Sequence, residues 1–144
     1  MTFQTLPQAG LSRLVVHEPH PSVGYARRTI VVQSSDTVPV KMGTLVFRVK
    51  SVSLNAPYAP VTANSALVAT NEFAVVFGDN YSYKESWIAA AAATVPNSVA
   101  FVQGEVILKD ELLVATTGFA FGTTDYLKMK QLLENQGIVI EQTL

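Results

Sequence analysis

The sequence predicts a mostly β, α+β domain with one short helix near its C-terminus and an extended arm at its N-terminus. Two observations predict this class. Short runs of β-branched and aromatic residues recur between turn-forming residues, and only one segment spaces its apolar residues as a helix does. We therefore divide the 144 residues into an arm, residues 1–24, and a single β-rich domain, residues 25–144.

The composition predicts that this domain binds a partner. Hydrophobic residues make up 49% of the chain and charged residues only 15%. A monomer with so few charged residues has little polar side-chain surface with which to cover itself. We therefore expect part of the apolar surface to meet another protein or another copy of the chain.

The first 24 residues are expected to form the arm because residues that favour turns and extended chain interrupt them throughout. These residues are Pro7, Gly10, Pro19, Pro21 and Gly24. One short apolar patch, residues 14–16, lies between them. A segment of this kind has no core of its own.

Strands are predicted in the first half of the domain. Residues 29–32 and 43–49 are rich in strand formers, and residues 34–36 supply a turn between them. Residues 51–71 follow neither a strand period nor a helix period and are expected to be mostly irregular. A hairpin should follow, with strands at residues 73–77 and 81–84 around a turn at residues 78–80.

Further strands are predicted in the second half. Residues 87–94 contain five consecutive alanines and are expected to form a short helical turn before Pro96. Residues 99–102 return to strand character. Residues 104–114 alternate imperfectly and suit one or two more strands.

One segment near the C-terminus is predicted to be a helix. Thr124 can cap its start, Asp125 favours the positive end of the helix dipole, and Gly137 can end it in the left-handed conformation. Its expected apolar stripe consists of Tyr126, Met129, Leu132 and Leu133. Residues 138–140 then form a closing strand.

The charges are unevenly distributed along the chain. The first fifty residues hold six basic and two acidic residues, a net charge of +4, and the remainder holds four basic and nine acidic residues, a net charge of −5. The net positive charge of the first fifty residues can steer the protein onto an acidic surface, but six separate basic residues are too few to form a nucleic-acid binding surface. We expect no nucleic-acid binding.

The sequence also predicts a soluble protein that does not enter a membrane. The longest apolar stretch, residues 87–93, is too short to span a bilayer, and the N-terminus lacks the pattern of a secretion signal. There is no cysteine, so neither a disulfide nor a thiolate site is possible.

One short segment offers a set of possible metal ligands, His17, Glu18 and His20. A zinc site needs ligands that converge, whereas Pro19 and Pro21 hold this segment extended. We expect these histidines to be solvated or to lie in an interface, and we predict no metal site.

Catalytic groups are also scarce. Asp110 and Glu111 are adjacent, so on the strand expected here they point to opposite faces and cannot form an acid and base pair; we expect them to be solvated. No nucleophile elbow, phosphate loop or dinucleotide fingerprint is present. We therefore predict a protein that is not an enzyme and has no catalytic residues and no cofactor.

A series of short motifs occurs in a definite order along the domain. Residues 24–32, Gly-Tyr-Ala-Arg-Arg-Thr-Ile-Val-Val, are followed by Lys-Met-Gly-Thr-Leu-Val at residues 41–46. Residues 99–107 and 112–114 then resemble a plain pair of strands, residues 127–136 a short helix, and residues 137–139 a terminal Gly-Ile-Val. This order resembles the head decoration proteins of tailed phages of the lambda D type, in which an extended arm leads into the first strand.

The resemblance implies a β-clip-like or small-barrel domain that forms a homotrimer on the outer capsid surface of the virion. Such a protein is made in the host cytoplasm and cements neighbouring subunits of the major capsid protein. An arm can bind by adding a strand to an exposed capsid sheet edge. The residues expected to contact the capsid are Phe3, Leu6, Pro7, Leu14, Val16, Tyr25, Arg27 and Arg28.

Two alternatives remain open at this point. The first is another virion subunit with a β-rich domain, such as a minor head, tail or fibre-base protein. The second is a small carboxylate-dependent hydrolase, which predicts that Asp79, Glu105 or Asp110 converge in a deep pocket.

Overall fold

The computed structural model describes residues 14–19, 26–33, 40–50, 56–79 and 94–142, and for residue 79 and residues 94–99 it describes the backbone alone. Several expected features lie outside the described residues. They are the arm up to residue 13, the turn at residues 34–36, the strand at residues 81–84 and all but the last residue of the helical turn at residues 87–94.

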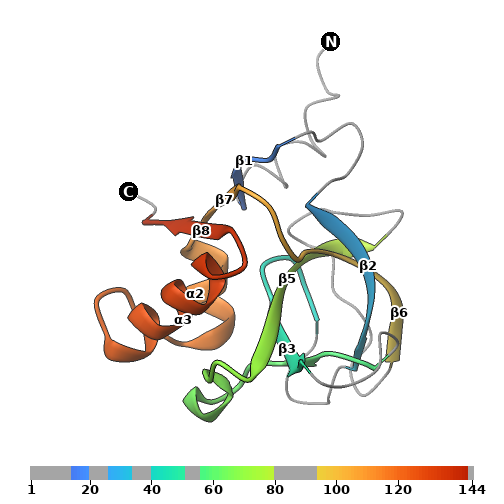
Figure 1. Ribbon diagram of the computed structural model, residues 1–144, viewed down its shortest axis with the longest axis horizontal. Helices are drawn as coiled ribbons and strands as arrows, with labels where there is room; N and C mark the ends of the chain where they lie inside the picture. Colours follow the sequence, from blue (N-terminus) through green and yellow to red (C-terminus); the bar gives the residue numbers. More distant parts are fainter. Residues whose placement is uncertain (1–13, 20–25, 34–39, 51–55, 80–93, 143–144) are drawn as a thin grey trace.

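The larger of two sheets has five antiparallel strands and confirms the mostly β prediction (Figure 1). From one edge to the other, its strands are β2 (Arg27–Gln33), β6 (Thr94–Phe101), β5 (Asn71–Asp79), β3 (Leu45–Val49) and β4 (Ala59–Pro60). β2, β3, β5 and β6 overlap the predicted strands. The turn expected at residues 78–80 was placed too early, because β5 continues through Gly78 and Asp79, and β6 begins at Thr94 rather than at residue 99. β4 and a 3-10 turn (Asn64–Ala66) are the short elements within the segment expected to be mostly irregular.

This sheet curls into a half-barrel until its two edge segments meet at Tyr58, the residue before β4. The backbone N–H of Tyr58 donates to the carbonyl of Val31 at 2.8 Å, and the N–H of Gln33 donates to the carbonyl of Tyr58 at 2.9 Å. These bonds occupy backbone groups of β2, which would otherwise be an open sheet edge.

β5 is buried on both faces, and its side chains alternate between two hydrophobic cores. Phe73, Val75 and Phe77 face the outer core, whereas Ala74 and Val76 face the interior of the half-barrel. Alternation is the expected consequence of strand geometry. The interior core consists of Ile30, Val32, Val40, Val46, Tyr58, Ala74, Val76 and Ala100.

A second, three-stranded sheet packs with the helices on the outer core. Its order is β1 (Val15–His17), β7 (Val106–Lys109) and β8 (Ile138–Glu141), with β1 antiparallel and β8 parallel to β7. Two helices connect β7 to β8, namely α2 (Glu111–Thr117) and α3 (Thr124–Glu134), and they lie together beside the half-barrel in Figure 1.

The prediction of one helix was wrong, because residues 111–117 form α2 where a strand was expected. β7 ends at Lys109, and Leu112 and Leu113 are buried from the helix rather than from a strand. β7 and β8 are parallel, so their connection must cross from one end of the sheet to the other, which helices usually do. A helix of seven residues is too short to reveal its period in the sequence.

α3 matches the predicted helix, with one correction at its start. Thr123, not Thr124, caps it, because the Thr123 hydroxyl accepts a hydrogen bond from the Tyr126 N–H at 3.2 Å. The predicted stripe is confirmed, since Tyr126, Met129 and Leu133 are buried and Leu132 packs against the same core. With 11 residues, α3 is the longest described helix, and none is long and apolar enough to cross a membrane.

Gln136, just after α3, ties the helical layer to β5. Its side-chain amide donates to the carbonyls of Phe73 at 2.7 Å and Val102 at 3.0 Å, and its side-chain oxygen accepts from the Phe73 N–H at 2.7 Å. Phe73 lies beyond the stretch of β5 that pairs with β6. The amide therefore takes the place of a neighbouring strand.

The close approach of Gly137 to the backbone of Gly104 can be tested by substitution. Its φ of +83° is unfavourable for other residues, and a Cβ here would lie 2.2 Å from the backbone oxygen of Gly104. Gly118 is a matched control, because its φ is +78° and a Cβ there would meet nothing within 4 Å. We expect Gly118→Ala to cost about 1 kcal/mol of unfolding free energy and Gly137→Ala at least about 3 kcal/mol. Urea denaturation followed by circular dichroism measures both, and equal losses would contradict the proposed clash.

Candidate functional site

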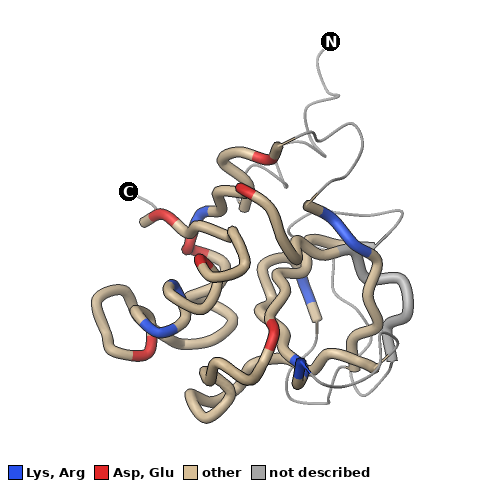
Figure 2. Tube along the Cα trace, viewed as in Figure 1, with Lys and Arg blue, Asp and Glu red and all other residues tan. Residues whose placement is uncertain are grey.

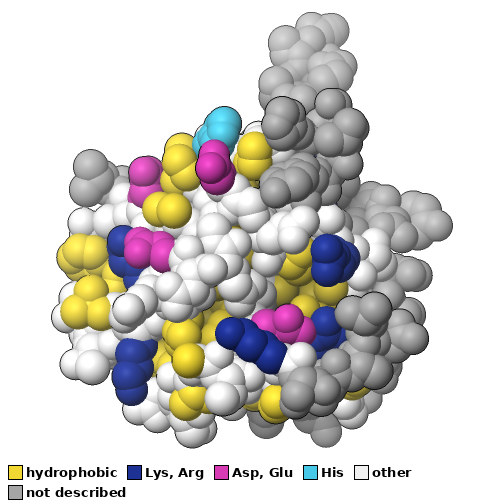
Figure 3. All heavy atoms as spheres, in the orientation of Figure 1, with side chains coloured by type: hydrophobic (Ala, Val, Ile, Leu, Met, Phe, Trp, Pro, Cys, Tyr) yellow, Lys and Arg dark blue, Asp and Glu magenta, His cyan; other side chains and the backbone are white. Residues whose placement is uncertain are grey.

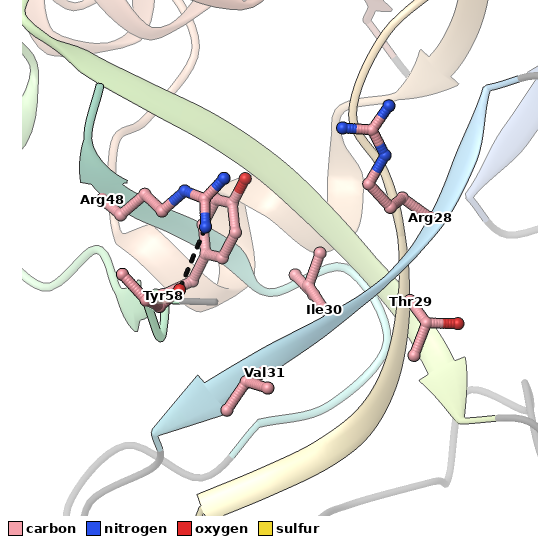
Figure 4. Close-up of a pocket in the computed structure, with 7 residues that line it drawn as sticks. Arg28, Thr29, Ile30, Val31, Arg48 and Tyr58 are labelled. Carbon is pink, nitrogen blue, oxygen red and sulfur yellow. Dashed lines mark hydrogen bonds between the residues drawn. The ribbon is translucent and has the colours of Figure 1, made fainter. Parts of the chain in front are cut away.

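A pocket of about 220 Å³ lies where β2 meets the segment of Tyr58 (Figure 4). The residues that line it come from β2, from β3 and from the chain before β4: Arg28, Thr29, Ile30, Val31, Arg48, Ala56 and Tyr58. The curling of the sheet makes this pocket, because β2 and β3 are separated by two strands in the sheet order. Two arginines therefore line one pocket.

Arg48 is a fixed cation in the wall of this pocket. It pairs across the sheet with Glu72 of β5, its register partner, through an ion pair from Nε to Oε1. One terminal nitrogen donates to the carbonyl of Ala56 at 3.1 Å, the contact dashed in Figure 4. The guanidinium also lies 4.5 Å from the centre of the Tyr58 ring, a cation–π distance. Several contacts on different elements thus hold this side chain.

The buried side chain of Tyr58 forms a second wall of the pocket. Burial, and then the charge of Glu72, raise the pKa of Tyr58 above its ordinary value of 10.0, against smaller opposite effects of Arg48 and Arg28. The phenol is therefore neutral at physiological pH, and the ring presents an uncharged surface to the pocket.

Arg28 differs from Arg48 because it is exposed. Its side chain forms no ion pair or hydrogen bond with another residue in the described parts of the chain. In Figure 4 the Ile30 side chain lies between the Arg28 side chain and the Tyr58 ring. Arg28 is therefore a cation that a ligand in the pocket can reach.

Arg27, a predicted capsid contact, is engaged within the chain. Its Nε and one terminal nitrogen each donate to a different Glu18 carboxylate oxygen at 2.7 Å. Its guanidinium also lies 4.9 Å from the centre of the Phe77 ring. Because the Glu18 side chain is only 5% exposed, this pair joins the segment after β1 to the half-barrel.

The other predicted capsid contacts fall into three groups. Leu14 is fully buried in the outer core and belongs to the domain rather than to a free arm. Val16, on β1, is 50% exposed. Phe3, Leu6, Pro7 and Tyr25 lie outside the described residues.

Neither of the described carboxylates of the hydrolase alternative, Asp110 and Glu105, lies in the pocket. Asp110 was expected to be solvated, but it is buried and accepts a hydrogen bond from the Tyr126 hydroxyl at 2.8 Å. Glu105 is exposed in the turn before β7, and the side chain of Asp79 lies outside the described part. No described carboxylate lines the pocket.

The possible metal ligands near β1 were His17, Glu18 and His20, and the two that the structure describes have different environments. Glu18 is bound to Arg27, His17 is exposed, and His20 lies outside the described residues. Across the described ranges, no three His, Cys, Asp or Glu side chains gather where they could hold a metal ion.

Sequence reasoning missed Arg48 and Tyr58 as site residues. The sequence contains one signal for Arg48. It lies two residues after Val46 on β3, so both side chains lie on the face of the strand that turns inward, where a charged residue is unusual. Tyr58 lies in the segment without periodicity, and its contact with β2 joins residues far apart in sequence, so no local pattern indicates it.

The described charges do not gather into a patch of one sign. In Figure 2 basic positions occur on β2 and in the half-barrel, while both signs occur along α3. On the face in Figure 3, basic, acidic and apolar side chains are interspersed. Exposed large apolar residues are likewise spread over several elements: Val16, Val49, Val68, Phe121 and Leu127.

Comparison with protein-family models, curated proteins and solved structures finds no match to this chain. The functional argument therefore depends on its own residues.

The buried contact between Asp110 and Tyr126 can be tested with Tyr126→Phe. Loss of the hydroxyl removes a donor from a buried carboxyl, so we expect a cost of about 1–3 kcal/mol near pH 7. Burial, then the hydrogen bond and the charge of Asp110, raise the pKa of Tyr126 above 10.0. Its contribution to stability is thus complete below pH 10 and is lost as the pH rises through the folded-state pKa.

The gap in unfolding free energy between wild type and Tyr126→Phe should therefore narrow as the pH rises above 10. Urea denaturation at a series of pH values from neutral to strongly alkaline measures the gap. A gap that stays constant over this range would contradict the assignment.

Proposed function

We propose that this chain is a capsid decoration protein of a tailed phage, which binds the outer surface of the head and bridges subunits of the major capsid protein. The order of the motifs along the domain carries the proposal. The arginines of the first motif, residues 24–32, lie at the start of β2, the Gly-Thr-Leu of the second motif leads into β3, and the terminal Gly-Ile-Val leads into β8. The motifs thus lie at the starts of strands of one domain, which supports the proposal.

One part of the resemblance differs from the fold. Leu112, Leu113 and Val114 were compared with the second of a pair of strands, but they belong to α2. The first of that pair, residues 99–107, is not a single strand either, because residues 99–101 end β6, residues 106–107 begin β7, and Gly104, with φ +86°, lies in the turn between them. The support therefore comes from β2, β3 and β8.

The edge strand β1 supports binding through the N-terminal side. Among described strands, β1 pairs with β7 alone, so its other edge offers backbone N–H and C=O groups to a partner strand. Val16 adds exposed apolar surface on the same strand. Residues 1–13 precede this edge directly and contain Phe3 and Leu6, the anchors that the sequence suggests.

Self-association as a homotrimer is part of the proposal. The exposed side chains of Phe121, in the turn before α3, and Leu127, in its first turn, are apolar surface that a neighbouring copy would cover. The hydrolase alternative receives no such support, because no described carboxylate lines the pocket. Another virion subunit would use the same edge and surface, and capsid binding separates the two.

The test is co-sedimentation with undecorated shells assembled from the major capsid protein of the same phage. The deletion must stop at residue 13, because Leu14 is part of the core and Glu18 binds Arg27. We expect deletion of residues 1–13 to weaken shell binding at least tenfold, equivalent to about 1.4 kcal/mol, and to leave the circular dichroism spectrum unchanged.

A second variant keeps the full chain length and carries Phe3→Ser with Leu6→Ser. It should also weaken shell binding, as the deletion does. Light scattering on the same samples should give the mass of a trimer. If the shells pellet while the wild-type chain stays in the supernatant, the decoration proposal is overturned. If the deletion variant binds the shells as strongly as wild type does, the role of the arm is overturned.

A further inference from the structure

We infer that the pocket between β2 and Tyr58 receives an acidic side chain, Asp or Glu, of the protein to which this chain binds, and that Arg28 pairs with its carboxylate. This inference deepens the proposed function and rests on it for the identity of the partner. It assigns a specific contact to a part of the molecule that is distinct from the arm.

The balance of charge in the pocket is the first argument. Two guanidinium groups line it, and of the described carboxylates only Glu72 neutralises one of them, through Arg48. Arg28 has no such partner among the described residues. Among the described residues, the pocket thus has one more positive charge than negative charge, which favours an anionic ligand.

The positions of the two arginines give them different roles. Arg48 is 11% exposed and bound to Glu72 and Ala56, so it contributes a fixed positive charge beside the ligand. Arg28 is exposed and can turn its planar guanidinium toward a carboxylate, which it binds with two parallel hydrogen bonds. The partly enclosed site also reduces the screening that weakens ion pairs on an open surface.

The remaining walls favour an acidic side chain over a free phosphate. Ile30, Ala56 and the ring of Tyr58 are uncharged and largely apolar, and they would pack against the methylene groups of Asp or Glu. The volume of about 220 Å³ is far above the roughly 10–15 Å³ that a single water needs, so several heavy atoms can enter. Because the Tyr58 phenol is neutral, it does not repel the incoming carboxylate.

The main test compares three full-length variants in the shell co-sedimentation assay. Arg28→Gln removes the charge, Arg28→Glu reverses it, and Lys128→Gln is a matched control that removes one charge from the exposed side of α3. We expect Arg28→Gln to weaken binding about tenfold and Arg28→Glu to weaken it further, while Lys128→Gln binds as wild type. Raising the salt concentration should weaken wild type more than Arg28→Gln.

The outcomes separate this inference from the function it rests on. If the arm deletion weakens binding while Arg28→Gln and Arg28→Glu bind as wild type, the pocket inference is overturned and decoration stands. If the wild type does not pellet with shells, decoration is overturned, and the pocket is judged by a second measurement that needs no capsid.

That second measurement is an NMR titration of the ¹⁵N-labelled full chain at low ionic strength. The probes are the capped peptide Gly-Glu-Gly, the same peptide with Gln in place of Glu, and inorganic phosphate. The inference expects the Glu peptide alone to shift the amides of Thr29, Val31 and Tyr58, and expects Arg28→Gln to abolish these shifts. Equal shifts with the Gln peptide, stronger shifts with phosphate, or no shifts at these amides would overturn it.

Discussion

The burial of β5 on both faces is the constraint on which the rest of the structure depends. Phe73, Val75 and Phe77 need the helices and the small sheet to cover them, whereas Ala74 and Val76 need the sheet to curl over their opposite face. A strand that is apolar on both sides has no face to leave in water. One strand therefore requires both layers of the fold, with its two phenylalanines in the outer core and Ala74 and Val76 in the interior of the half-barrel.

The closure of the sheet at Tyr58 explains why the pocket lies at the margin of the half-barrel. Tyr58 forms backbone hydrogen bonds to Val31 and Gln33 of β2, and its side chain belongs to the interior core. A charge on the inward face of β3 would be costly inside this apolar core. Arg48 instead remains at the rim, where Glu72, a carbonyl and an aromatic face compensate its charge. The closure of the sheet and the charged site thus have a common origin.

The sequence was sufficient for most strands and for α3 because their patterns are local. Runs of β-branched and aromatic residues predicted β2, β3 and β5, and the spacing of the stripe on α3 predicted which of its residues are buried. It failed at α2, since seven residues with two adjacent buried leucines fit a strand as well as a helix. The pocket was beyond prediction for a different reason. Arg28, Arg48 and Tyr58 meet only after the sheet has curled, and curling depends on contacts between distant segments.

Arg27 and Arg28 are adjacent on β2, but their side chains lie on opposite faces of the strand and make different contacts. Successive side chains on β2 point to opposite faces, so Arg27 reaches the outer side, where Glu18 and the Phe77 ring hold it, and Arg28 reaches the side of the pocket. Glu18 neutralises the first arginine and in doing so fixes the segment that follows β1. The second arginine has no equivalent carboxylate among the described residues. This difference between two adjacent arginines, one compensated within the domain and one exposed beside the pocket, is the basis on which we propose that Arg28 meets the negative charge of a partner.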